Sequence, residues 1–140
     1  MSATTTHTDH QVLNFGLGEE RYCVDISLVD EIVDRTAKLT VLPDAPLHVE
    51  GVMDLRGRTT TIVDPKKALG LSTTSEPQRI VIFEAGPDES PVGWLVDEVE
   101  QVVGILDEDV DASVASSSVH GIVRSDDGFV IWVDPVSINS

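Results

Sequence analysis

Residues Val49–Pro65 read VEGVMDLRGRTTTIVDP, and a similar stretch, VHGIVRSDDGFVIWVDP, occupies Val119–Pro135. The two stretches align without a gap, because 119 − 49 and 135 − 65 both equal 70. Val, Gly, Val, Asp and Pro recur at matching places, Val49, Gly51, Val63, Asp64 and Pro65 in the first copy and Val119, Gly121, Val133, Asp134 and Pro135 in the second. The central turns differ, with Arg56-Gly57-Arg58 in one and Asp126-Asp127-Gly128 in the other. The repeat predicts a scaffold that occurs twice, in which the first turn carries a function.

The elements around the two copies repeat as well. Each half reads as a hairpin, a connection, a strand, a turn, a strand and the start of a short helix. Many short strands separated by Gly and Pro turns predict an all-β fold of two small barrels, related by a pseudo-twofold axis and packed around a shared core. We expect a disordered tail over residues 1–11, a first barrel mainly over 12–70, a linker over 71–78 and a second barrel mainly over 79–137.

Local patterns predict several individual elements. Ser27 is expected to cap a short helix with one apolar stripe, formed by Leu28, Val29, Ile32 and Val33. Residues 38–42 and 98–105 are expected to be strands, and Asp64-Pro65 to begin a helix. Gly51 interrupts a strand pattern and predicts a bulge or a close approach of two backbones. The run from Trp94 to Asp97 echoes the run from Tyr22 to Asp25 in the other half.

Charge excludes some partners. The 140 residues hold 25 Asp and Glu against 9 Lys and Arg, a net charge of −16. Such a surface repels nucleic acid and anionic membranes. An acidic, lysine-poor chain also suggests a protein that works at high salt, where repulsion between charges is screened. The single cysteine, Cys23, cannot form an internal disulfide and is expected to be a small buried residue in a reducing cytosol. We find no signal peptide and no apolar run of the roughly 20 residues that would span a membrane.

The sequence contains no P-loop, no GxSxG and no HExxH motif. Helix capping accounts for Asp64 and Asp134, and His7, Asp9 and His10 lack the rigid frame that a metal site needs. We therefore predict no catalytic residues, no metal and no cofactor. The Arg56 turn offers guanidinium donors in an acidic chain. It can pair with an internal carboxylate or contact a partner, and the sequence leaves both alternatives open.

Three stretches then resemble a known family, the CheW chemotaxis coupling proteins. They are FGLGEERYCVDI from Phe15 to Ile26, VDEI from Val29 to Ile32, and GVMDLRG from Gly51 to Gly57 followed by Ile62-Val63-Asp64. The resemblance covers nearly the whole chain after residue 11, as one domain over 12–140. It implies two intertwined, SH3-like, five-stranded β-barrels without enzymatic activity. It also implies a cytoplasmic adaptor that couples the cytoplasmic tips of methyl-accepting chemoreceptors to the histidine kinase CheA in membrane-associated arrays, without inserting into the membrane.

The resemblance assigns two sets of contact residues. The receptor-binding set is Ile26, Val29, Glu31, Ile32, Arg56 and Gly57. The kinase-binding set, expected to face the regulatory domain of CheA, is Trp94, Val96, Val99 and Val102. The chain departs from the family at Asp54, where Asn is usual, and at Cys23, where a small residue is usual. The family's C-terminal helix is shortened or absent after Ser137.

Two other interpretations stay open at this point. One is a coupling domain of a receptor–kinase pathway other than chemotaxis, which would differ only in its partners. The other is a small hydrolase or ligand-binding barrel that uses His48, His120 or Cys23 in a polar pocket.

Overall fold

The computed structural model describes residues 8–35, 39–71, 77, 79–125 and 128–139. Within these residues the chain is mostly strand, with two short α-helices and three single turns of 3₁₀-helix. The strands are β1 (His10–Leu17), β2 (Glu20–Asp25), β3 (Val29–Asp34), β4 (Val49–Leu55), β5 (Arg58–Val63), β6 (Arg79–Phe83), β7 (Val92–Val96), β8 (Glu98–Ile105), β9 (Val110–Asp111), β10 (Val119–Ser125) and β11 (Gly128–Val133). The helices are α1 (Pro65–Ala68) and α2 (Pro135–Asn139), and the 3₁₀ turns are η1 (Ile26–Leu28), η2 (Asp107–Asp109) and η3 (Ala112–Val114).

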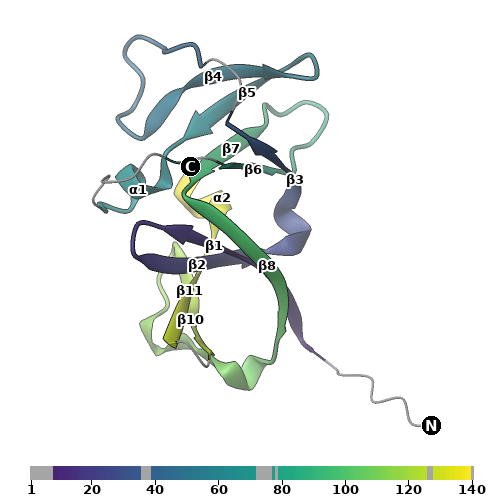
Figure 1. The fold of residues 1–140 in the computed structure, drawn as a ribbon, viewed down its shortest axis with the longest axis vertical. Coiled ribbons are helices and arrows are strands. Elements are labelled where there is room, and N and C mark those ends of the chain that lie inside the picture. The colour runs from purple at the N-terminus through teal and green to yellow at the C-terminus, as the bar shows by residue number, and fades with distance from the viewer. Residues whose placement is uncertain (1–7, 36–38, 72–76, 78, 126–127, 140) are drawn as a thin grey trace, which may run out of the picture.

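The strands form two sheets, one above the other in Figure 1. Sheet A has the order β8-β1-β2-β11-β10-β9, and sheet B has the order β3-β6-β7-β5-β4. The predicted all-β class with two similar units is confirmed. Sheet B has the predicted five strands, whereas sheet A gains a sixth from the two-residue strand β9.

Each sheet takes strands from both halves of the chain. The first hairpin, β1–β2, lies in sheet A beside β10 and β11, and the later hairpin, β6–β7, lies in sheet B beside β4 and β5. The predicted division into residues 12–70 and 79–137 is therefore not the division that the sheets follow. The two parallel contacts show the pseudo-twofold axis, because Ile131 is paired with Tyr22 and Thr61 with Val92, and 131 − 61 and 92 − 22 both equal 70.

The predicted helix after Ser27 is wrong. Only Ile26–Leu28 forms a helical turn, and Val29–Asp34 is strand β3, paired antiparallel with β6. The Asp25 carboxylate accepts a hydrogen bond from the Ser27 amide at 2.9 Å, which caps this single turn. A register shift between Val29 and Glu31 interrupts the alternation of the strand. This bulge gave the apolar residues a spacing that imitates a helix.

Other local predictions had mixed outcomes. Asp64 caps α1 and Pro65 begins it, as predicted. Residues 98–105 form β8, also as predicted. Of the predicted strand over 38–42, residue 38 lies outside the described residues, and Thr40 makes only an isolated bridge to Val52. Of the predicted tail, residues 1–7 lie outside the described residues and His10 already begins β1. Residues 72–76 and 78 of the predicted linker also lie outside them.

The repeated glycine has a steric reason. A Cβ atom on Gly51 would lie 2.4 Å from the Thr40 carbonyl oxygen, and one on Gly121 would lie 2.7 Å from the Asp111 carbonyl oxygen. The register of β4–β5 also shifts between Val49 and Gly51. The predicted bulge and close backbone approach are both confirmed.

Strand pairing corrects one detail of the internal repeat. Trp132 lies opposite Cys23 in sheet A, and Ile62 lies opposite Gly93 in sheet B. Because 132 − 62 and 93 − 23 both equal 70, Gly93 is the counterpart of Cys23. The predicted echo, which placed Trp94 against Tyr22, was therefore out of register by two residues.

Three apolar clusters hold the fold together. The largest joins both sheets, with Leu13, Phe15 and Tyr22 from sheet A against Val81 and Trp94 from sheet B. One smaller cluster includes Cys23 and Trp132 of sheet A, and another includes Ile62 and Ile80 of sheet B. The predicted shared core is thus confirmed.

Candidate interaction site

The turn between β4 and β5 presents Arg56. Arg56 has φ 53° and Gly57 has φ 80°, the left-handed pair that a tight two-residue hairpin turn requires. The guanidinium Nη2 lies 2.7 Å from Glu31 Oε2 on β3. The Glu31 side chain is 18% exposed, whereas the Arg56 side chain is 75% exposed. Arg56 therefore pairs with an internal carboxylate, which is one of the two alternatives that the sequence left open. Most of its side chain stays exposed and available to a partner.

The second arginine of the turn has a different task. Arg58 Nη2 donates to the carbonyl oxygens of Glu89, at 2.7 Å, and Gly86, at 3.2 Å. These bonds fasten the turn to the β6–β7 loop. Arg56, Glu31 and Arg58 line a cavity of about 190 Å³ at this end of sheet B.

The predicted receptor-binding residues fall into two groups. Ile26, Val29 and Ile32 are half-buried and pack against the core that the two sheets share. Glu31 lies opposite Ile82, which belongs to the cluster inside sheet B, and it reaches Arg56 beside Gly57. The structure brings the two charged residues together and places the three apolar ones along the edge of the shared core.

Two of the predicted kinase-binding residues are fully buried. Trp94 and Val96 are both 0% exposed. They lie on β7, which has neighbours on both sides in sheet B, so direct contact with a partner through these side chains is excluded. Val99 is half-buried and Val102 is 47% exposed. The predicted set is therefore reduced to Val99 and Val102, which are the counterparts of Val29 and Ile32 at a separation of 70 residues.

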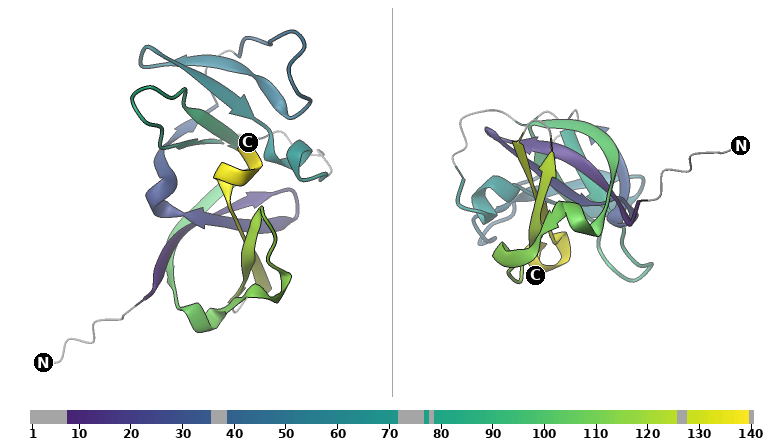
Figure 2. Two further views of the ribbon diagram at one scale, coloured as in Figure 1. Left: turned by 180° about the vertical axis from the view of Figure 1, so that it is seen from behind. Right: turned by 90° about the horizontal axis from the view of Figure 1, so that it is seen from below.

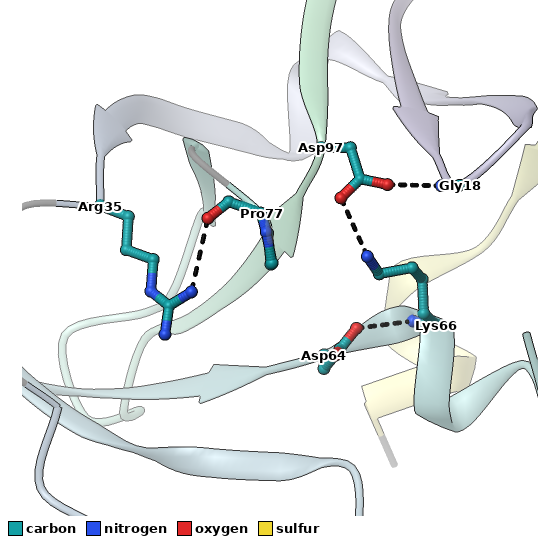
Figure 3. Close-up of polar contacts among 6 residues, drawn as sticks. All are labelled: Gly18, Arg35, Asp64, Lys66, Pro77 and Asp97. Atoms are coloured by element: carbon teal, nitrogen blue, oxygen red, sulfur yellow. Dashed lines mark hydrogen bonds and ion pairs between the residues drawn. The ribbon is translucent and has the colours of Figure 1, made fainter. Parts of the chain in front are cut away.

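A buried charge cluster, which the sequence did not predict, joins the two sheets (Figure 3). The Lys66 side chain on α1 is 0% exposed, and its Nζ lies 2.9 Å from Asp97 Oδ1 at the junction of β7 and β8. The other Asp97 oxygen accepts a hydrogen bond from the Gly18 amide in the β1–β2 turn. The Asp64 carboxylate caps α1 by accepting from the Lys66 amide at 3.0 Å. Burial raises the pKa of Asp64 above its usual value, although the bond from Lys66 opposes this shift.

Figure 3 also shows Arg35, the residue directly after β3, whose Nη1 donates to the Pro77 carbonyl oxygen at 3.5 Å.

The only sequence signal for the Lys66 cluster was the two lysines directly after Asp64-Pro65 in a lysine-poor chain. That signal indicated a helix start and gave no hint of burial.

The residues of the hydrolase alternative do not form a catalytic arrangement. Cys23 is 0% exposed, and burial raises the pKa of its thiol to about 12, so the thiolate nucleophile does not form near neutral pH. His120 is exposed and lies with its ring 5.0 Å from that of Trp132, and His48 is half-buried. His10, the described histidine of the N-terminal group, is hydrogen-bonded to Asp107 at 2.7 Å.

Two features are absent from the described part of the chain. No group of three or more His, Cys, Asp and Glu side chains there could hold a metal ion. No helix among those same residues is long and apolar enough to cross a membrane.

Comparison with known proteins extends over almost the whole chain. The sequence model of the CheW-like domain matches residues 11–140. The chemotaxis protein CheW of Rhizobium meliloti is 35% identical over 105 residues, which cover 75% of this chain and 67% of that protein. The CheW of Thermotoga maritima is 28% identical over 130 residues, which cover 90% and 85%. The crystal structure of the scaffolding protein TtCheW from Thermoanaerobacter tengcongensis superposes with a TM-score of 0.77 at 29% identity, covering 89% of this chain and 88% of that one.

Proposed function

The chain belongs to the CheW-like family of chemotaxis scaffold proteins, and we propose that it couples the cytoplasmic tips of chemoreceptors to the histidine kinase CheA. The observation that carries this proposal is the agreement of sequence and fold over almost the full described chain. We further propose that it acts without enzymatic activity and resides in the cytoplasm, at membrane-associated receptor arrays.

The receptor surface in this proposal runs along the edge of the shared core. Ile26, Val29 and Ile32 are half-buried there, so each leaves part of an apolar side chain for a partner helix. The exposed Arg56 guanidinium and the Glu31 carboxylate add a charged contact at the end of sheet B, and Gly57 allows the turn that presents Arg56. Val99 and Val102 on β8 are proposed for the kinase contact.

The test is binding of the full chain to two partners, a receptor-tip fragment and the regulatory domain of CheA, each measured by isothermal titration calorimetry. Arg56→Glu should weaken binding of the receptor-tip fragment by about tenfold or more, because it reverses a charge on the proposed receptor surface. Arg124→Glu is the matched control, since Arg124 is also exposed but lies on sheet A. Failure of the folded wild-type chain to bind either partner would reject the proposal, and binding to partners from another receptor–kinase pathway alone would favour the non-chemotactic alternative.

A charge swap separates the two roles of Arg56. In the double variant Arg56→Glu with Glu31→Arg, the internal ion pair can re-form with its charges exchanged. Restored binding would mean that the pair only holds the turn in place. Binding that stays weak would mean that the Arg56 guanidinium or the Glu31 carboxylate itself contacts the partner.

A further inference from the structure

The internal repeat places α1 and α2 in equivalent positions. Asp64 Oδ1 accepts from the Lys66 amide at 3.0 Å, and Asp134 Oδ1 accepts from the Val136 amide at 3.0 Å. The amides of the two aspartates are also held alike, each donating at 2.8 Å, to the carbonyl oxygen of His48 in one copy and of Ser118 in the other. Lys66 and Val136 are therefore counterparts, and both helices lie at the junction of the two sheets (Figure 2, left).

The space beside the two helices is filled differently. Next to α1, the Lys66 side chain is fully buried and reaches Asp97 beside the β1–β2 turn. Next to α2, Val136 is too short to do so and is 64% exposed. A cavity of about 200 Å³ lies there, between α2, the end of η1 and the β6–β7 loop.

The lining of this cavity suits a cation on an aliphatic stem. Leu28 and Val92 supply apolar wall, and the charged residues of the lining are two carboxylates, Glu84 and Glu89, with no basic side chain among the residues that line it. Glu89 Oε1 accepts from the Gly86 amide at 2.9 Å, which orients that carboxylate. A lysine side chain can lay its methylene groups along apolar surface while its ammonium group reaches a carboxylate.

We propose that this cavity receives a lysine side chain from a partner protein, as its counterpart receives Lys66 from the chain itself. The inference rests on the internal repeat, the cavity and its charge, and does not depend on which partners the adaptor couples. The carboxylates of Glu84 and Glu89 supply the negative charge here that Asp97 supplies to Lys66 in the counterpart. The longer loop on this side, Glu84–Pro91, keeps the cavity open where the short β1–β2 turn closes over Lys66.

The test is a titration of the full ¹⁵N-labelled chain with Nα-acetyl-lysine N-methylamide, followed by NMR at low ionic strength. The indole of Trp94 is a built-in reporter, because its Nε1 donates to Asn139 Oδ1 at 2.7 Å at the cavity wall. We expect saturable shifts at this indole and at Val92, with a dissociation constant on the order of millimolar for so small a probe. The norleucine analogue, which lacks the ammonium group, should not produce them. Equal shifts from both probes, or shifts that do not saturate, would overturn the proposal.

Variants of the chain make the test independent of probe chemistry. Glu84→Gln and Glu89→Gln should each weaken the probe by about two- to fivefold, the effect of losing one partly exposed ion pair. Val136→Lys should fill the cavity from within and abolish the shifts. Val114→Lys is its control, because Val114 is 50% exposed on η3 and lies outside the cavity lining. Probe binding that survives in the folded Val136→Lys variant would show that the probe binds elsewhere.

Discussion

The buried Lys66–Asp97 pair is the contact between the sheets whose loss should cost most. Lys66 Nζ and Asp97 Oδ1 are 2.9 Å apart, and their side chains are 0% and 15% exposed. Removing one partner of a buried ion pair typically costs about 3–5 kcal/mol, because the remaining charge stays desolvated without its counterion. We expect Asp97→Asn to fall in this range, since Lys66 would keep a fully buried charge.

Lys66→Met should cost less, about 2–3 kcal/mol, because Asp97 retains some exposure and the bond from the Gly18 amide. The double variant should then be less destabilised than the sum of the two single variants, with a coupling of about 2 kcal/mol. A domain of this size is stable by about 5–15 kcal/mol, so these changes are a large share of the total.

Urea unfolding at one fixed salt concentration measures all three variants. Asp34→Asn is the matched control, because the Asp34 carboxylate lies 3.0 Å from Arg79 Nε and its own side chain is 71% exposed, against 15% for that of Asp97. That substitution should cost no more than about 1 kcal/mol. A cost for Asp97→Asn as small as that of the control, or strict additivity in the double variant, would refute the buried-pair interpretation.

Three further predictions concern the core, a repeated glycine and the surface charge. The folded Cys23 thiol keeps its proton up to a pKa of about 12, against 9.0 for an exposed thiol, so the free energy of unfolding should fall by up to ~1.4 kcal/mol per pH unit above about pH 9. Cys23→Ala, compared with wild type by urea unfolding at pH 8 and 10, should remove this part of the decline, and an unchanged slope would contradict it. Gly51→Ala should destabilise by about 1–3 kcal/mol, since its Cβ would meet the Thr40 carbonyl oxygen at 2.4 Å. Gly104→Ala should cost clearly less, because its nearest neighbour is the movable Thr8 side chain, and equal melting temperatures for the two would disprove the steric argument. The net charge of −16 predicts a melting temperature that rises between low and molar KCl, and a flat or falling curve would count against adaptation to high salt.

Much of the fold was predictable from local pattern. The repeat of Val49–Pro65 at Val119–Pro135 predicted two similar units, and it also predicted the capped starts of α1 and α2. The glycine shared by the two copies predicted a close backbone approach, which the carbonyl oxygens of Thr40 and Asp111 provide. The helix predicted after Ser27 failed because a bulge in a strand can give apolar residues a helical spacing over a few positions.

The candidate site was predictable only in part. Arg56 and Glu31 were both identified by family resemblance, and they lie 2.7 Å apart. Trp94 and Val96 were assigned to a surface, although an unbroken apolar run is equally typical of a buried strand.

The amino-acid sequence by itself determined the all-β class, the internal repeat, the capped helix starts and the arginine turn, because each depends on residues close together in the chain. Only the tertiary structure decided which strands share a sheet, since alternation along a strand marks its faces and not its neighbours. It also decided that Lys66 is buried against Asp97 while its counterpart Val136 borders an open cavity. Burial of a charge depends on segments that approach from far along the chain, here the β1–β2 turn and the β7–β8 junction.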